Sequence, residues 1–194
     1  MSLDDTQIDR VLHALERRLS LAGERFEIVV IGGSALAALG LVARTTRDVD
    51  VVAMVDRDGL VSALPLPPTL AAAAQIVGVD FELEPGWLNA GPAGLLDFGL
   101  PEGFVERCVV RDYGPSLRVL YASRFDQIHF KLYALVDQGS GRHEADLRAL
   151  QPTGAEIEAA AAWARTHDPS QGFADVLARI LHHLGFDDGR SAAP

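Results

Sequence analysis

The sequence contains a single cysteine, Cys108, among 194 residues. One cysteine excludes an intrachain disulfide and a zinc site built from four thiolates, so cysteine usage gives no sign of an oxidising compartment. Positive charge is also scarce, because 17 Lys and Arg residues face 27 Asp and Glu residues, a formal net charge of −10 at pH 7. Proteins that coat nucleic acid nonspecifically rely on Lys and Arg to neutralise phosphates. The sequence therefore argues against that class, while leaving room for one local basic site.

A long uninterrupted hydrophobic run is missing as well. The longest apolar stretch, residues 28–41, is broken by Gly32, Gly33, Ser34 and Gly40. Residues 1–10 are polar and acidic, which is unlike a secretory signal. We therefore expect a cytoplasmic protein with no membrane partner. The hydrophobic fraction of 48% is too high for a disordered chain and sufficient for one full core.

Hydrophobic periodicity predicts an α/β protein that ends in helices. Helices are expected over residues 4–21, 35–39, 69–81, 123–135, 144–150 and 173–184. A further helix is expected to start at the capping box formed by Thr153 and Glu156. Strands are expected over residues 26–31, 49–55, 95–98, 105–110 and 117–121, the last two forming a hairpin. This order suggests an α/β core over residues 1–122, a helical subdomain packed on it over 123–186, and a flexible tail over 187–194.

The residues that suggest a chemical function lie between residues 32 and 51. Gly32 and Gly33 follow a strand, where a Gly-Gly turn lets the backbone approach a ligand closely. Ser34 is a good N-cap, and the free N–H groups of the following helix would form an anion site. Asp48 and Asp50 are one residue apart in an extended stretch, so their side chains should point to the same face.

Two adjacent carboxylates repel each other unless a cation joins them. Mg²⁺ is a natural partner, because it commonly binds one or two carboxylates together with substrate phosphates. A phosphate cradle beside a carboxylate pair is typical of metal-assisted phosphoryl or nucleotidyl transfer. Each half of this pattern is common by itself in connecting turns and solvated strands. The segment matches neither the P-loop nor the dinucleotide-binding fingerprint.

The combined pattern resembles a known superfamily. The pattern consists of Gly33-Ser34, a spacer of thirteen residues, and Asp48-x-Asp50. It is similar to the signature of nucleotidyltransferases related to DNA polymerase β. The wider motifs are Gly32-Gly33-Ser34-Ala35-Leu36 and Arg44-Thr45-Thr46-Arg47-Asp48-Val49-Asp50. They resemble a bacterial branch that contains abortive-infection-type nucleotidyltransferase toxins. Two downstream segments also look like motifs of that branch. Its Lys-Leu-x-Ala helix resembles Phe130-Lys131-Leu132-Tyr133-Ala134-Leu135, and its Asp-Leu motif resembles His143-x-x-Asp146-Leu147-x-x-Leu150. The resemblance covers roughly residues 26–150.

The resemblance implies a minimal nucleotidyltransferase fold, in which helices flank a small mixed sheet. It implies transfer of a nucleoside monophosphate from an NTP to a hydroxyl, with two Mg²⁺ ions, or Mn²⁺ in their place. The implied metal ligands are Asp48, Asp50 and a third acid from a neighbouring strand, for which we choose Asp97 over Asp80 and Asp112. The implied catalytic residues are Asp48, Asp50, Asp97 and Lys131. The implied nucleotide-binding residues are Gly32, Gly33, Ser34, Arg47, Lys131 and Asp146.

Several alternatives stay open at this point. Lys131 and Asp146 could equally form a structural ion pair. The acceptor could be RNA, such as the tRNA 3′ end that some resembling toxins modify, a protein hydroxyl or a small molecule. The resemblance also implies a cognate antitoxin or a role in phage defence. Rival functions are a catalytically inactive regulatory module of the same fold and an adenylyltransferase that modifies an antibiotic. The sequence does not indicate an oligomeric state.

Overall fold

The computed structural model describes residues 2–186, and the chain divides after Ser123 into two units. The first unit contains α1 (Asp5–Ala22), β1 (Phe26–Ile31), α2 (Gly32–Ala38), β2 (Val49–Asp56), β3 (Gly59–Ser62), α3 (Pro68–Asp80), β4 (Leu88–Asn89), the 3₁₀ helix η1 (Gly91–Leu96), α4 (Phe104–Arg107), β5 (Val109–Gly114) and β6 (Leu117–Tyr121). The second contains α5 (Arg124–Gln138), α6 (Arg142–Ala149), α7 (Gly154–His167) and α8 (Gln171–Leu184). Within residues 2–186, no helix combines the length and apolarity that crossing a membrane requires.

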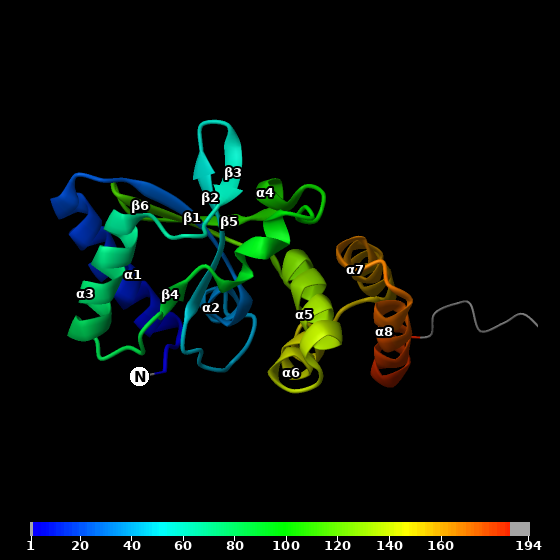
Figure 1. Ribbon diagram of the computed structural model, residues 1–194. Helices are drawn as coiled ribbons and strands as arrows, with labels where there is room; N and C mark the ends of the chain where they lie inside the picture. The colour runs from blue at the N-terminus through cyan, green and yellow to red at the C-terminus, as the bar shows by residue number, and fades with distance from the viewer. Residues whose placement is uncertain (1, 187–194) are drawn as a thin grey trace, which may run out of the picture. The chain divides into compact units, whose positions relative to one another are not determined.

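The first unit is organised around a six-stranded mixed sheet (Figure 1). Its strand order is β3-β2-β1-β6-β5, and β4 pairs with β2 outside this path. Strand β1 runs antiparallel to β2 and parallel to β6, while the pairs β2–β3 and β5–β6 are antiparallel. The predicted class, a mixed sheet flanked by helices and followed by a helical C-terminal part, is therefore confirmed.

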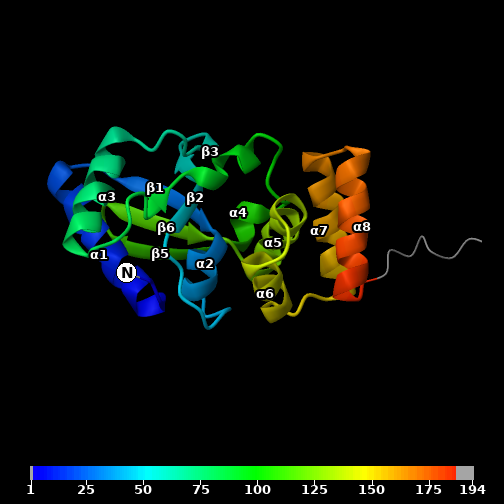
Figure 2. The same ribbon diagram turned by 60° about the horizontal axis from the view of Figure 1, so that its bottom comes forward.

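Alternation along the strands gives the sheet two different faces. Ile28 and Val30 belong to the main core, together with the buried sides of α1 and α3, which pack side by side (Figures 1 and 2). On the neighbouring strand β2, Val51 lies opposite Val30, and Asp50 lies opposite Ile31. Because directly opposed residues share a face, Asp50 lies on the face that is turned away from this core.

Helix α1 forms for reasons that are visible in its sequence. Its predicted apolar stripe is completely buried and consists of Ile8, Val11, Leu12, Leu15 and Leu19. Each such side chain contributes about 1.5–3 kcal/mol on full burial. Asp4 caps the helix, because its carboxylate accepts the N–H of Gln7 at 2.8 Å while the Gln7 side chain accepts the N–H of Asp4 at 2.9 Å. The helix ends at Gly23, whose φ of 71° suits glycine.

Helix α5 is the centre of the second unit and contacts α6, α7 and α8. The Arg124 guanidinium at its start donates to the carbonyl oxygens of Leu150 and Gln151 and forms an ion pair with Glu156. Glu156 also completes the predicted capping box of α7 with Thr153, which is confirmed. One arginine therefore ties the start of α5 to the chain segment that enters α7.

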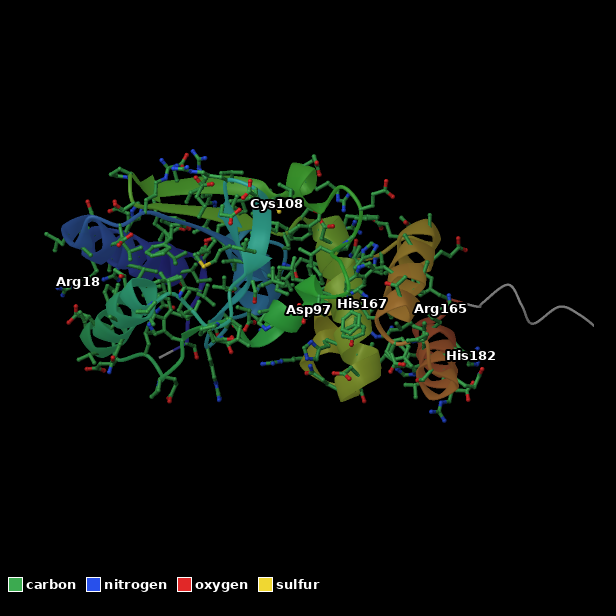
Figure 3. The ribbon with its side chains drawn as sticks, turned by 45° about the horizontal axis from the view of Figure 1, so that its top comes forward. Arg18, Asp97, Cys108, Arg165, His167 and His182 are labelled. Atoms are coloured by element: carbon green, nitrogen blue, oxygen red, sulfur yellow. The ribbon has the colours of Figure 1, made fainter. Side chains whose placement is uncertain are left out.

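An aromatic cluster joins α5, α7 and α8. The Trp163 ring lies within 6 Å, centroid to centroid, of four rings, those of His129, Phe130, Tyr133 and His167. The closest of these is His167, labelled in Figure 3, at 4.1 Å. Tyr133 extends the cluster to Phe173 on α8, at 5.8 Å. Aromatic contacts therefore contribute to the packing of these three helices.

Two predicted strands are wrong, fully or in part. Residues 95–98 do not form a strand, because Gly91–Leu96 is the 3₁₀ helix η1 and Asp97 follows it in a turn. Pro92 favours the start of this helix, since its ring presets a helical φ and its missing N–H is not needed in the first turn. The strand predicted over 105–110 begins only at Val109, because residues 104–107 form the short helix α4.

Helix α2 begins earlier than predicted, so Ser34 is not its N-cap. The helix starts at Gly32, and Ile31 occupies the N-cap position without a side-chain hydrogen bond. Ser34 is instead the third helical residue and is fully buried. Its hydroxyl donates to the carbonyl oxygen of Ile31 over 3.4 Å. The remaining predicted helices and strands are confirmed to within a few residues at each end.

Candidate functional site

The candidate site lies where β1 ends, β2 begins and β4 pairs with β2. Gly32 and Gly33 follow the last residue of β1, and Asp48 and Asp50 flank the first residue of β2. Val49 between the two carboxylates is buried in the main core, whereas both aspartates are half-buried. The segment from residue 32 to residue 51 is thus folded back on itself, so that the glycine pair and Asp50 come together.

Gly32 lies directly against Asp50. Its φ of 75° is in the left-handed region, which favours glycine. A Cβ atom at this position would lie only 2.7 Å from Oδ2 of Asp50. A larger residue at position 32 would therefore be strained and would also displace one oxygen of the carboxylate.

Gly33 lies against the loop that leads into β2. A Cβ atom there would come within 2.9 Å of Oγ1 of Thr46 and 3.2 Å of a guanidinium nitrogen of Arg44. The two glycines thus allow the side chains of three other residues to approach the backbone closely. The sequence predicted a close approach by a ligand, and in the structure the chain's own polar side chains occupy part of that space.

Asp48 is held by Thr46. The Thr46 hydroxyl donates to Oδ1 of Asp48 at 3.1 Å. The Thr46 backbone is fixed by an isolated bridge to Leu3, with N–H···O distances of 2.7 and 2.9 Å in the two directions. A buried, doubly anchored threonine therefore restricts where the Asp48 carboxylate can lie.

Asp50 is held by Asn89, a residue that the sequence did not identify as part of the site. Strand β4 pairs in parallel with β2, so that Asn89 is the partner of Asp50 in the ladder. The amide nitrogen Nδ2 of Asn89 donates to Oδ1 of Asp50 at 3.1 Å. The only local signal for this contact is a polar residue between apolar neighbours, Leu88 and Ala90, which does not reveal a partner 39 residues away.

Asp97 is not gathered with the aspartate pair. It is exposed at the end of η1 (Figure 3), although η1 itself packs against β2. Among residues 2–186, no three or more His, Cys, Asp or Glu side chains form a group that could hold a metal ion. The two acids not chosen pair elsewhere, Asp80 with Arg18 and Asp112 with Arg118, each at 2.8 Å. The role of Asp97 as a third metal ligand stays a prediction.

Lys131 and Asp146 form a buried ion pair in the second unit. Nζ of Lys131 on α5 lies 2.8 Å from Oδ2 of Asp146 on α6, and the two side chains are only 6% and 1% exposed. Lys131 is the only lysine in the chain, which carries 16 arginines. Removing one partner of a buried pair is strongly destabilising, so the pair has a structural role whatever else it does. Contact of either residue with a nucleotide stays a prediction.

The other expected nucleotide contacts have different surroundings. Arg47, next to Asp48, is exposed. Ser34 is fully buried. Comparison with protein-family models, with curated proteins and with solved structures gives no significant match.

The donor set fits a hard divalent cation that also takes oxygens from a substrate. Asp48 and Asp50 supply carboxylate oxygens, which are the ligands Mg²⁺ prefers, and Mg²⁺ commonly completes its shell with water and phosphate. One further observation agrees with this. The Asp50 carboxylate lies where a Cβ at Gly32 would collide with it, so the glycine allows the carboxylate to pack against the turn.

Proposed function

We propose that this protein is a Mg²⁺-dependent nucleotidyltransferase that moves a nucleoside monophosphate from an NTP to a hydroxyl acceptor. The observation that carries the proposal is the aspartate pair, held by Thr46 and Asn89 beside the glycine turn. The arrangement places two oriented, half-buried carboxylates beside a glycine turn that is packed by the side chains of Asp50, Thr46 and Arg44.

In the proposed reaction, the acceptor oxygen forms a bond to the α-phosphorus. The bond from that phosphorus to the oxygen that bridges it to the β-phosphate breaks, pyrophosphate leaves, and the hydroxyl proton passes to solvent. Bound Mg²⁺ would neutralise phosphate charge and make the hydroxyl easier to deprotonate. Asp48 and Asp50 would hold it, while Thr46 and Asn89 would keep the two carboxylates oriented. Preorganised charge of this kind is commonly a large contribution to catalysis.

The acceptor class stays a prediction. RNA, a protein hydroxyl and a small molecule such as an antibiotic remain the candidates, and an antitoxin partner is an expectation from the resemblance alone. The rival function, an inactive regulatory module, is favoured by one observation, which is that residues 2–186 contain no three-membered metal-binding group. The two functions differ in whether the aspartate pair is needed for nucleotide transfer.

The test is transfer of label from each of four α-labelled NTPs, with Mg²⁺ and cell extract, by the wild type and by three variants. We expect Asp48→Ala and Asp50→Ala to lose at least about a hundredfold of the transfer rate, as is usual when charge stabilisation is removed. The matched control is Asp58→Ala, which removes an exposed carboxylate from the β2–β3 turn and should retain full activity. Equal activity in all four proteins would contradict the proposal and favour the regulatory module.

A further inference from the structure

Asn89 uses both ends of its side-chain amide. Its Oδ1 accepts the backbone N–H of Gly91 at 2.8 Å, and its Nδ2 donates to Oδ1 of Asp50 at 3.1 Å. A backbone N–H can only donate, so the bond to Gly91 requires the oxygen of the amide on that side. The NH₂ group is therefore turned toward Asp50, and the direction of the amide follows from the hydrogen bonds.

The turn after β4 is built around this side chain. Asparagine commonly bonds the backbone N–H two residues ahead, which closes a tight turn. A Cβ atom at Gly91 would lie 2.9 Å from Oδ1 of Asn89, so a side chain at position 91 would push against the amide oxygen that accepts its N–H. The same turn starts η1, where Pro92 follows. The fold thus fixes the oxygen of Asn89 in place, and the amide nitrogen is presented to the carboxylate as a consequence.

We propose that Asn89 is a positioning residue for the metal-binding carboxylate of Asp50, an inference that rests on the proposed function. The amide donates to one oxygen of Asp50, while the other oxygen faces the Gly32 backbone. Asn89 orients the carboxylate without adding charge, so the anionic charge of the site is limited to that of the aspartate pair. Partners that hold a metal ligand in this way typically contribute 10- to 100-fold to metal affinity.

Asn89→Asp keeps the acceptor for the turn but removes the donor to Asp50. Aspartate has the same shape and still accepts the N–H of Gly91, but its second oxygen cannot donate to Asp50 and brings a third negative charge beside it. Asn89→Ala loses both contacts. We expect Asn89→Ala to weaken binding of Mn²⁺ alone at least about tenfold, and Asn89→Asp to strengthen it, because affinity for hard cations rises with the number of charged ligands. The added carboxylate would attract a cation whether or not Asn89 orients Asp50, so the deciding variant is Asn89→Ala. A residue that served only the turn would leave Mn²⁺ affinity unchanged in Asn89→Ala.

Asn89 is the only asparagine in the chain, which allows a direct spectroscopic test. Selective ¹⁵N-asparagine labelling yields one side-chain NH₂ pair in the NMR spectrum. We expect one proton of this pair to shift in Asp50→Ala, and Mn²⁺ to broaden the pair in the wild type but not in Asp50→Ala. Asp58→Ala is again the control and should behave as the wild type.

The outcomes separate the two proposals. An NH₂ pair that does not shift in Asp50→Ala, or an unchanged Mn²⁺ affinity in Asn89→Ala, would overturn the role of Asn89 and leave the proposed function standing. Absence of any Mn²⁺ binding or broadening in the wild type would overturn both. Each variant also needs a thermal unfolding curve with the wild-type shape, so that loss of the fold is not read as loss of the ion.

Discussion

Two residues without side chains determine how the candidate site is assembled. Gly32 admits Asp50 on one side of the turn, and Gly33 admits Thr46 and Arg44 on the other. Neither contact is visible in the sequence, in which a Gly-Gly pair indicates only that the backbone is flexible and unobstructed. The structure adds that the space freed by the missing Cβ atoms is used by the chain's own carboxylate and hydroxyl groups.

Gly32→Ala should therefore damage stability and the site together. The substitution places a Cβ 2.7 Å from Oδ2 of Asp50 on a residue with φ of 75°. A non-glycine residue in the left-handed region is destabilised by about 1 kcal/mol or more, and the clash adds to this. We expect a loss of about 2–3 kcal/mol in the free energy of unfolding, measured by urea denaturation.

The control for this prediction is Gly94→Ala in η1. A Cβ atom at Gly94 meets nothing within 4 Å, and its φ lies outside the left-handed region. Gly94→Ala should change the free energy of unfolding by less than about 1 kcal/mol. Comparable losses in the two variants would show that the close approach at Gly32 is not what destabilises the protein.

Among the elements of the second unit, one carboxylate connects the start of α5 with the start of α7. Glu156 pairs with Arg124 at the start of α5 and accepts hydrogen bonds from the backbone N–H and the hydroxyl of Thr153 at the start of α7. The hydrogen bond from Arg124, followed by those from Thr153, lowers the pKa of Glu156 from 4.5 to about 2. The folded state therefore binds this proton less readily than the unfolded chain does.

This lowered pKa predicts a specific loss of stability in acid. Because the folded pKa lies below the unfolded one, the stabilisation is fully present above about pH 4.5 and is lost as the pH falls toward about 2. Glu156→Gln should remove about 1–2 kcal/mol at neutral pH and flatten the pH dependence between these values. The measurement is the free energy of unfolding at several pH values for the wild type, Glu156→Gln and the control Glu158→Gln, an exposed neighbour on α7. Parallel wild-type and Glu156→Gln curves would contradict the prediction.

Elements with many periodic residues could be predicted from the sequence, and elements that depend on distant partners could not. The stripe from Ile8 to Leu19 predicts α1, because five apolar residues repeat with the helical period. Strand β4 has two residues and no periodicity, and it forms only because β2 lies beside it. The same holds for Asn89, whose partner Asp50 is 39 positions away. Leu95 and Leu96 suit a strand or a helix equally. They are helical because they continue the 3₁₀ helix that starts at Gly91 and Pro92.

Across the whole molecule, acidic residues outnumber basic ones, and several of the basic side chains are already paired. The net charge is −10. Basic side chains that form ion pairs with the chain's own acids include Arg18, Arg25, Arg111, Arg118, Arg124, Lys131 and Arg148. An NTP carries about four negative charges, so an acidic chain needs a source of positive charge to bind it. In the proposed function, that source is the divalent ion held by the aspartate pair.

NTP binding by this protein should therefore depend strongly on the divalent ion. We expect calorimetry to show at least about a tenfold weaker affinity for each NTP in EDTA than in Mg²⁺, because the ion screens the repulsion between the phosphates and the carboxylates. In Asp50→Ala the affinity should be low and should no longer respond to Mg²⁺, whereas Asp58→Ala should respond as the wild type does. An NTP that binds equally well in EDTA would mean that arginine side chains supply the positive charge. In that case the aspartate pair would not be the nucleotide site, even if the fold is that of a nucleotidyltransferase.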